Sequence, residues 1–274
     1  MTQPALRSVA GITYREAEPS QESEWTPVVC LHGWPQSSYM YRHLLSALAS
    51  ADRRALAPDF PGFGDSPPDP PGTFERQVEV VERFRRELGL DRIVLVVHDT
   101  GGLIGLRWAC DHPEAVSGLV ITNTGFFPDH GWLEIAETMR TPIQGEALVD
   151  SLSREAFATL LEAASTELDD AALDEYWKAF TTPEGRRGML ELYRSFELEE
   201  LRPLQRKLAS LGVPTLILWG QADEFLPLDY ASRFAGQIAG SKLVLLEGVR
   251  HFLFEDEPER CAREVIGFLQ ESGV

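Results

Sequence analysis

The stretch that decides the fold runs from Arg92 to Gly102 and reads RIVLVVHDTGG. Its first half is an aliphatic run with the length of a buried strand, and a helical pattern starts at Leu103. Between strand and helix stands Asp99, followed by three small residues. A strand, a sharp turn with one reactive side chain and a helix form an elbow that exposes an attacking atom. The pattern predicts that Asp99 is a nucleophile.

A carboxylate at this position determines the kind of reaction that the elbow would carry out. With an ordinary pKa near ~4, Asp99 is already an anion at neutral pH and needs no base before it attacks. Its attack on a saturated carbon would form an ester, which favours substrates such as haloalkanes or epoxides over ordinary esters and amides. A simpler interpretation is that Asp99 only caps the following helix, since aspartate is common at that position.

The composition limits the class of protein. The chain has 274 residues, of which 43% are hydrophobic and 25% charged, and this suits one large globular domain or a domain with an inserted segment. Its 43 acidic and 25 basic residues give a formal charge of -18, which repels phosphate backbones and anionic membranes. We therefore expect neither nucleic acid nor a membrane as a partner, and the pattern leaves the oligomeric state open.

The cysteines and the N-terminus indicate the compartment. No apolar run approaches the ~20 residues of a membrane span, and the first residues lack the basic and apolar regions of a signal peptide. Metal-ligand spacings and a glycine-rich phosphate loop are also missing from the sequence, so we expect no metal and no cofactor. We expect a cytoplasmic, reduced protein with three buried thiols, Cys30, Cys110 and Cys261.

Strand and helix patterns alternate along most of the chain, which predicts an α/β fold with a mainly parallel sheet and helices on both faces. Strands are expected at 26–31, 54–58, 92–97, 116–122, 214–219 and 242–246, after an opening strand or hairpin arm within 6–16. Helices are expected at 37–51, 74–88, 103–111, 229–239 and 256–270. Between about 125 and 205 the pattern is helical throughout. We therefore expect a core of residues 1–124 and 206–274 and a helical cap of residues 125–205.

Further candidate residues lie at the ends of other predicted strands. His251 follows strand 242–246, and Asp223 follows the strand that ends in WG at 219–220. Sites in open α/β sheets form at the carboxyl ends of strands, and the order nucleophile, acid, histidine matches one known type of catalytic triad. The backbone N–H groups of Trp34, in the turn HGWP at 32–35, and of Thr100 would stabilise a developing oxyanion.

Taken together, five segments resemble the α/β-hydrolase superfamily, and within it the haloalkane dehalogenase and epoxide hydrolase branch. They are HGWPQSSYMYRHLL at 32–45, DFPGFGDS at 59–66, VVHDTGG at 96–102, TPEGRR at 182–187 and HFLFEDEPE at 251–259. The resemblance implies an α/β-hydrolase core with a helical cap over a buried pocket. It also implies two steps, in which Asp99 displaces a leaving group and His251, oriented by Asp223, activates the water that hydrolyses the resulting ester.

The chain departs from both patterns at Thr100, because dehalogenases and epoxide hydrolases commonly place Trp directly after the nucleophile. Trp34 or the Thr100 hydroxyl would then stabilise a halide. As an alternative, Tyr193 in MLELYR at 189–194 resembles the cap tyrosine with which epoxide hydrolases protonate the opening ring. That branch normally uses two such tyrosines, and only one is evident here.

Several residues carry a structural interpretation beside a functional one. Trp34 is also compatible with packing against the cap, and Tyr193 with the core of the cap. Asp129 is an alternative to Asp223 as the acid, although Asp223 stands in the usual WGxxD form. We expect Trp108 and Trp219 in the core, and Tyr193, Trp132, Trp177 and Phe126 in the substrate pocket.

The sequence thus predicts a hydrolase like haloalkane dehalogenases, which acts with water on a small apolar molecule. The first alternative is an epoxide hydrolase with Tyr193 as the acid. An alternative from another class is a ligand-binding protein on the same fold that has lost catalysis.

Overall fold

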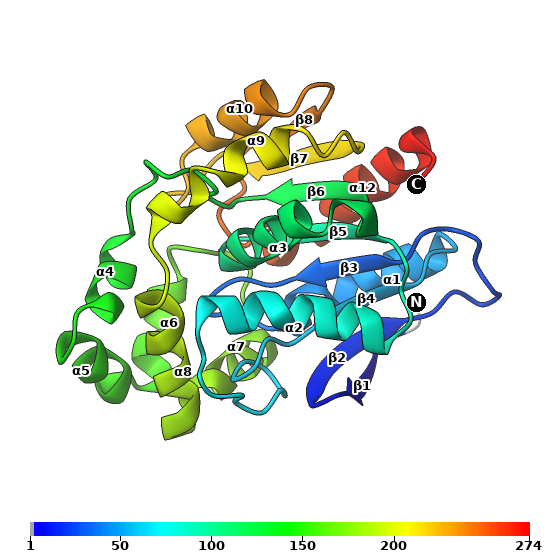
Figure 1. The fold of residues 1–274 in the computed structure, drawn as a ribbon. Helices are drawn as coiled ribbons and strands as arrows, with labels where there is room; N and C mark the ends of the chain where they lie inside the picture. The colour runs from blue at the N-terminus through cyan, green and yellow to red at the C-terminus, as the bar shows by residue number, and fades with distance from the viewer. Residues whose placement is uncertain (1–2) are drawn as a thin grey trace.

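The computed structural model describes residues 3–274 and has one mixed sheet at its centre (Figure 1). The strand order is β1-β2-β4-β3-β5-β6-β7-β8, in which β1, β2 and β4 pair antiparallel and all other neighbours pair parallel. The strands are β1 (Ala5–Val9), β2 (Ile12–Ala17), β3 (Val28–Leu31), β4 (Ala55–Pro58), β5 (Ile93–His98), β6 (Val116–Thr122), β7 (Thr215–Gly220) and β8 (Lys242–Leu246). The mainly parallel α/β fold predicted from the sequence is confirmed.

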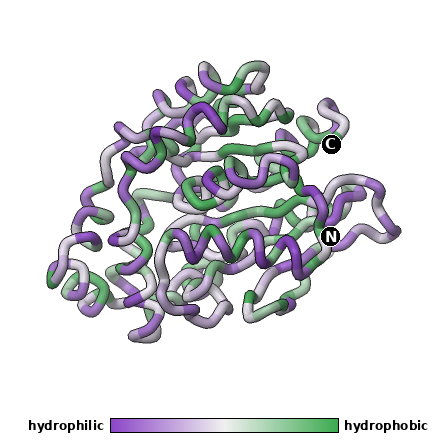
Figure 2. The backbone as a smooth tube through the Cα atoms, in the orientation of Figure 1, coloured by the Kyte–Doolittle hydropathy of each residue, from purple (hydrophilic) through white to green (hydrophobic). Residues whose placement is uncertain are grey.

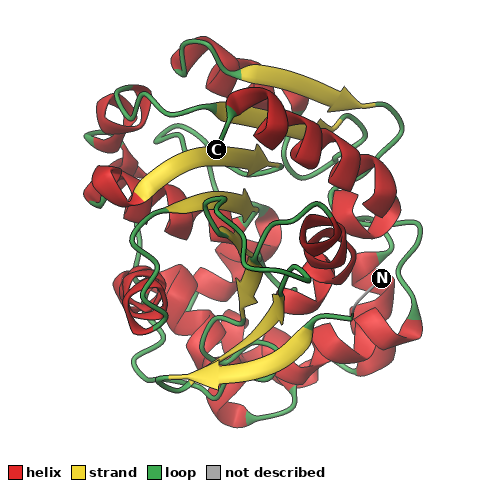
Figure 3. Ribbon diagram, turned by 90° about the vertical axis from the view of Figure 1, so that its right-hand side faces the viewer, coloured by secondary structure: helices red, strands yellow, loops and turns green. Residues whose placement is uncertain are grey.

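Helices cover both faces of the sheet, with α2 and α3 in contact on one face and α1 and α12 in contact on the other (Figures 1 and 3). The helices outside the insertion are α1 (Arg42–Ser50), α2 (Phe74–Glu87), α3 (Thr100–Asp111), α10 (Leu228–Gln237), α11 (Leu253–Asp256) and α12 (Pro258–Ser272). Short 3₁₀ helices are η1 (Ser38–Tyr41), η2 (Pro113–Ala115), η3 (Lys178–Phe180) and η4 (Leu198–Leu201). The short helix α11 was not predicted.

The central strands are mostly apolar and buried along their whole length because both of their faces are covered. Every residue of β3, β4, β5 and β6 is buried. In Figure 2 these strands form the green centre of the molecule, and hydrophilic segments surround them. Continuous apolar runs of this kind are typical of parallel strands between two helical layers, and this is why they were recognisable in the sequence.

Local sequence signals set the ends of several elements. The opening arm is the hairpin of β1 and β2, whose turn residues Ala10 and Gly11 both have positive φ, at 47° and 79°. Two positive φ angles in succession are characteristic of the tight turn that matches the twist of a hairpin. Helix α2 begins after Thr73, whose hydroxyl accepts the N–H of Arg76 at 3.4 Å, and ends before Gly89, whose φ is 64°.

The insertion between β6 and β7 consists of helices in the described structure and contains no strand. Its helices are α4 (Glu134–Arg140), α5 (Gln144–Ser151), α6 (Arg154–Leu161), α7 (Asp170–Trp177), α8 (Pro183–Arg194) and α9 (Leu204–Ala209). Helices α4 to α8 lie beyond the strand ends toward which the arrowheads of β3 and β6 point (Figure 1). Whether residues 125–205 form a separate cap domain with those limits stays a prediction.

Three general features of residues 3–274 bear on the sequence predictions. All three cysteines are buried free thiols, as expected. No helix in this part of the chain is long and apolar enough to cross a membrane. Nor do its His, Cys, Asp and Glu side chains form a group of three or more that could hold a metal ion.

Candidate active site

The elbow after β5 is a turn made by one residue. Asp99 has φ 49° and ψ −127°, and α3 begins at Thr100 rather than at the predicted Leu103. A non-glycine residue in such a conformation costs about 1–3 kcal/mol, and strain of this kind collects at functional sites. Asp99 does stand at the N-cap position of α3, but its side chain makes no capping hydrogen bond to that helix.

The glycines around Asp99 allow three chain segments to approach closely. A Cβ atom at Gly33 would lie 2.3 Å from the Cβ of Asp99. One at Gly101 would lie 2.3 Å from the carbonyl oxygen of His32. Gly101 lies inside the first turn of α3, where a side chain would collide with the backbone of His32.

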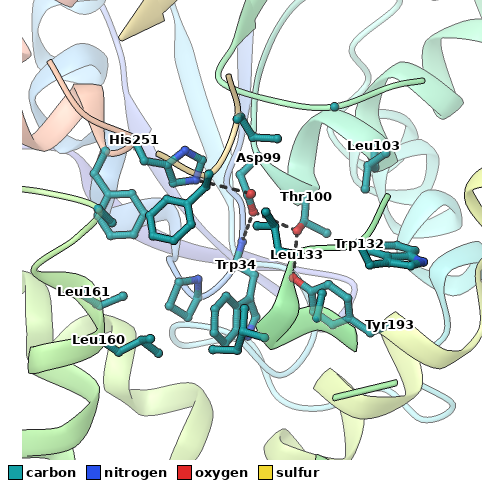
Figure 4. A pocket seen from close by; sticks show the side chains of 18 of the residues that line it. Trp34, Asp99, Thr100, Leu103, Trp132, Leu133, Leu160, Leu161, Tyr193 and His251 are labelled. Atoms are coloured by element: carbon teal, nitrogen blue, oxygen red, sulfur yellow. Dashed lines mark hydrogen bonds and ion pairs between the residues drawn. The ribbon is translucent and has the colours of Figure 1, made fainter. Parts of the chain in front are cut away.

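The two oxygens of the Asp99 carboxylate have different surroundings (Figure 4). Oδ1 accepts hydrogen bonds from the backbone N–H of Trp34 at 2.8 Å and from the hydroxyl of Thr100 at 2.9 Å. Oδ2 lies 3.5 Å from Nε2 of His251. Oδ1 is thus held by two donors, whereas Oδ2 has the imidazole of His251 as its neighbour.

His251 is held on its other side by Asp223, as the sequence order suggested. Its Nδ1 lies 2.7 Å from Oδ2 of Asp223, so Nδ1–H donates to this carboxylate and Nε2 faces Asp99. Oδ1 of Asp223 accepts the backbone N–H groups of Phe225 at 2.8 Å and Leu226 at 3.1 Å. The structure therefore brings Asp99, His251 and Asp223 together in one line of contacts.

Asn123 is a further part of this site that the sequence analysis missed. It follows β6 directly, and its amide donates to Oδ2 of Asp223 at 2.6 Å while its carbonyl oxygen accepts the N–H of Gly220 at 3.0 Å. Its place at the end of a predicted strand was the available signal. The alternative acid, Asp129, has a side chain that is 68% exposed and pairs with Arg233 at 2.6 Å, so it does not contact His251.

The charges of Asp99, His251 and Asp223 shift one another's pKa values in the direction that keeps each group ionised. Burial by itself would raise the pKa of Asp99, but the hydrogen bond and charge of His251 outweigh it and hold this pKa well below its usual range. Burial would likewise lower the pKa of His251, but the charge and hydrogen bond of Asp223, followed by those of Asp99, raise it to about 10. The resting site therefore holds an imidazolium between two carboxylates at neutral pH.

Because His251 is protonated in the resting site, its availability as a base depends on the charge of Asp99. Conversion of Asp99 into a neutral ester removes one of the two negative charges that raise the pKa of His251. The pKa of His251 then falls toward its ordinary value, and Nε2 becomes able to take a proton. The arrangement thus suits a reaction in which Asp99 acts first and His251 acts second.

We expect the two steps of such a reaction to differ in their pH dependence. Formation of an Asp99 ester should keep its rate down to about pH 5, because the Asp99 pKa is depressed and the carboxylate stays ionised. Hydrolysis of the ester should become faster as pH rises, with a midpoint between about 6.5, the ordinary His value, and the resting value of about 10. Rapid-quench measurements of both steps across this range would check the prediction. A hydrolysis rate that falls with rising pH would contradict it.

A pair of hydroxyl groups lies beside Asp99 on the side away from His251. The oxygens of Thr100 and Tyr193 are 3.3 Å apart, and since the Thr100 proton is donated to Asp99, Tyr193 is the donor between them. Burial and the charge of Asp99 raise the pKa of Tyr193, so its hydroxyl stays protonated. The ring N–H of Trp34 donates to the sulfur of Met189 at 3.3 Å, which is a weak acceptor.

These groups face a cavity of about 80 Å³ with a mostly apolar lining. Trp34, Thr100, Tyr193 and Trp132 line it, as expected. Phe126 and Trp177 do not: Phe126 is fully buried, and Trp177 stacks on the ring of Phe180 with centroids 5.3 Å apart. Residues missed by the sequence analysis also line it, among them Leu103, His130, Leu133, Leu160, Leu161, Ala164 and Phe252.

Trp108 and Trp219 are fully buried in the core, as predicted.

The fold and the elbow agree with a comparison to known protein families. The family model described as alpha/beta hydrolase fold matches residues 26–258. The chain belongs to the α/β-hydrolase family. "Haloalkane dehalogenase 2" of Mycobacterium tuberculosis is 33% identical over 261 residues, covering 89% of this chain and 88% of the relative. This α/β-hydrolase is therefore a haloalkane dehalogenase-like enzyme of the hydrolase class.

Two further comparisons place it more closely within the family. The crystal structure of haloalkane dehalogenase DbeA from Bradyrhizobium elkani superimposes with a TM-score of 0.81 at 27% identity and covers 98% of both chains. The "cis-3-alkyl-4-alkyloxetan-2-one decarboxylase" of Shewanella oneidensis is 28% identical over 268 residues, covering 92% of this chain and 84% of the relative. This α/β-hydrolase thus has relatives named for two different reactions, dehalogenation and decarboxylation.

Proposed function

We propose that this enzyme hydrolyses the carbon–halogen bond of small apolar haloalkanes through an ester of Asp99. The observation that carries the proposal is the unequal environment of the Asp99 carboxylate. Oδ1 accepts two hydrogen bonds, whereas Oδ2 accepts neither of them and lies 3.5 Å from His251 Nε2. A carboxylate with one oxygen held by two donors and the other beside His251 is suited to attack carbon, and the dehalogenase names of the relatives support a halide as the leaving group.

In the first step, a lone pair of Asp99 Oδ2 forms a bond to the substrate carbon while the carbon–halogen bond breaks and the halide leaves with its electron pair. In the second step, Nε2 of His251 takes a proton from water, and the water oxygen attacks Cγ of the ester. The negative charge that develops on Oδ1 meets the N–H of Trp34 and the hydroxyl of Thr100. Collapse of this intermediate releases an alcohol and restores the carboxylate.

Two donors are available for the halide in this proposal, because the single proton of the Thr100 hydroxyl is donated to Asp99. The ring N–H of Trp34 is held only by the thioether of Met189, which competes weakly with an anion. The hydroxyls of Thr100 and Tyr193 lie next to one another on the same side of Asp99. Thr100 stands where the wider family usually has the second ring N–H, and since its proton goes to Asp99, the neighbouring Tyr193 hydroxyl would take over that role.

A second candidate function is the opening of a strained oxygen ring such as an epoxide. The observation that favours it is the protonated Tyr193 hydroxyl, which hydrogen-bonds to Thr100 beside Asp99 and can give its proton to an alkoxide. The relative named as an oxetan-2-one decarboxylase also has a strained, four-membered oxygen ring in its named substrate. In this reaction Asp99 would form the same kind of ester, and only the leaving group would differ.

The experiment that tests the proposal compares the native enzyme with Tyr193→Phe on 1-bromobutane and on 1,2-epoxybutane. We expect the native enzyme to release bromide, and Tyr193→Phe to keep bromide release within about tenfold, because the ring N–H of Trp34 remains as a donor for a halide. A diol as the main product, reduced about 10²-fold or more in Tyr193→Phe, would replace the first candidate by the second. If neither bromide nor diol forms, the proposed hydrolysis is wrong.

A further inference from the structure

The loop that carries His251 is bound along its backbone by the inserted helical segment. We call residues 250–256 the histidine loop. The N–H of Phe252 donates to the carbonyl oxygen of Ala164 at 2.9 Å. The Arg250 side chain donates to the carbonyl oxygen of Glu162 at 2.7 Å. The link between α6 and α7 thus forms hydrogen bonds with residues on both sides of His251.

The acidic residue at the end of the histidine loop strengthens this connection. Oδ1 of Asp256 accepts the Ser165 hydroxyl at 2.6 Å and the N–H of Thr166 at 3.0 Å. Its Oδ2 accepts the N–H of Arg250 at 3.2 Å, which ties the two ends of the loop together. One carboxylate therefore joins the start of the loop, the end of the loop and the α6–α7 link.

Glu255 forms a second and fully buried connection. Its side chain is 1% exposed and accepts two hydrogen bonds from the guanidinium of Arg42, at 2.7 and 2.8 Å. Oε1 also accepts the hydroxyl of Tyr176, a buried residue of α7. Removing a partner from a buried carboxylate destabilises the protein, so Glu255 stays bound to both partners. These contacts fix the histidine loop relative to both α1 and α7.

The same inserted segment also faces the substrate cavity. Leu161 and Ala164, at the end of α6 and in the α6–α7 link, line the cavity together with His251 and Phe252. A substrate in this cavity is therefore surrounded by residues of the segment that binds the histidine loop. Asp223 fixes the direction of the imidazole through Nδ1, but it makes no contact with the rest of the histidine loop among the described hydrogen bonds.

We propose that Tyr176, through Glu255, is a positioning residue that keeps His251 where it can deliver water to the Asp99 ester. This inference rests on the proposed function, because it concerns the second step of that reaction. The His251 Nε2 atom lies 3.5 Å from Asp99 Oδ2, and a displacement of about 1 Å in a catalytic group typically costs about 10²-fold in rate. Ester formation needs no base, so it is insensitive to this displacement.

The test uses the full-length Tyr176→Phe protein, with the time course of its intact mass after mixing with 1-bromobutane. We expect ester formation within about twofold of native and ester hydrolysis slowed about tenfold or more, so that the ester accumulates. The matched control is Asp174→Asn, which breaks an exposed pair between α6 and α7 with Arg154 and leaves the histidine loop alone. The control should accumulate no ester.

Ser165→Ala provides a second variant in case Tyr176→Phe unfolds, since it removes one hydrogen bond at the other carboxylate of the loop. We expect it to slow ester hydrolysis about threefold, again without an effect on ester formation. Variants that lose thermal stability but accumulate no more ester than Asp174→Asn would overturn the inference, because their effect would then be structural only.

A second readout separates this inference from the proposed function. The titration of His251 can be followed by nuclear magnetic resonance without any substrate. If Tyr176 positions His251, the pKa of His251 should shift downward from about 10 in Tyr176→Phe, because its contacts with the two carboxylates loosen, and not in Asp174→Asn. That shift supports the positioning role even if the native enzyme forms no ester. An unchanged titration contradicts it.

Discussion

The Asp99→Asn protein is expected to lose activity about 10⁴-fold or more, the largest effect of any single substitution in this enzyme. An amide oxygen carries no negative charge, so it cannot form the ester on which both candidate reactions depend. The loss should appear in the first turnover, as no increase in mass and no release of bromide. Intact mass and bromide release after mixing with 1-bromobutane would measure it.

Asp99→Asn should fold, which makes the loss interpretable. Asparagine tolerates positive φ better than most residues, and its carbonyl oxygen can accept the same two donors as Oδ1 of Asp99. The matched control is Asp129→Asn, the same chemical change in the exposed acid that pairs with Arg233. It should keep native activity. Bromide release by Asp99→Asn at a native rate would show that another group is the nucleophile.

The fold was predictable because its main signals are local. The apolar run before Asp99, the hydroxyl of Thr73 before α2 and Gly89 after it each encode an element within a few residues. The three residues at the strand ends were predictable for the same reason. Parallel strands bring their carboxyl ends to one edge, so Asp99, Asp223 and His251 could be expected together before their distances were known.

Other parts of the site depend on contacts between distant segments, and no local pattern shows them. Asn123 acts on Asp223, which lies 100 residues away, and an asparagine directly after a strand is also common in ordinary turns. Gly101 was assigned to the turn, so α3 was predicted to begin only at Leu103. In the structure Gly101 lies inside α3, and glycine is needed there because of the nearby carbonyl oxygen of His32. Trp177 is a large aromatic residue within the predicted cap and was therefore expected in the pocket, but its ring packs on Phe180 instead.

Replacing His251 by Phe is expected to leave ester formation intact and stop the reaction there. Asp99 Oδ2 attacks without a base, but the water of the second step then has no group to take its proton. Turnover should fall about 10³-fold or more, while the protein gains the mass of one alkyl group. Intact mass and peptide mapping after mixing with 1-bromobutane would place that group on Asp99. His251 lowers the pKa of Asp99, so its replacement lets that pKa rise. The experiment should therefore be done at about pH 8, where Asp99 stays ionised even in the absence of His251.

The surroundings of His251 allow this substitution. Phe225 and Phe252 already place their rings next to the imidazole, with centroids 5.4 and 5.5 Å away. Asp223 loses its His251 partner but keeps the amide of Asn123 and two backbone N–H donors, so the cost should stay below the about 3–5 kcal/mol of a fully unpaired buried charge. His43→Phe, at an exposed histidine of α1, is the control and should turn over without a stable adduct. An unmodified His251→Phe protein would show that His251 is needed before the ester forms, and the order of the two steps proposed for Asp99 and His251 would be wrong.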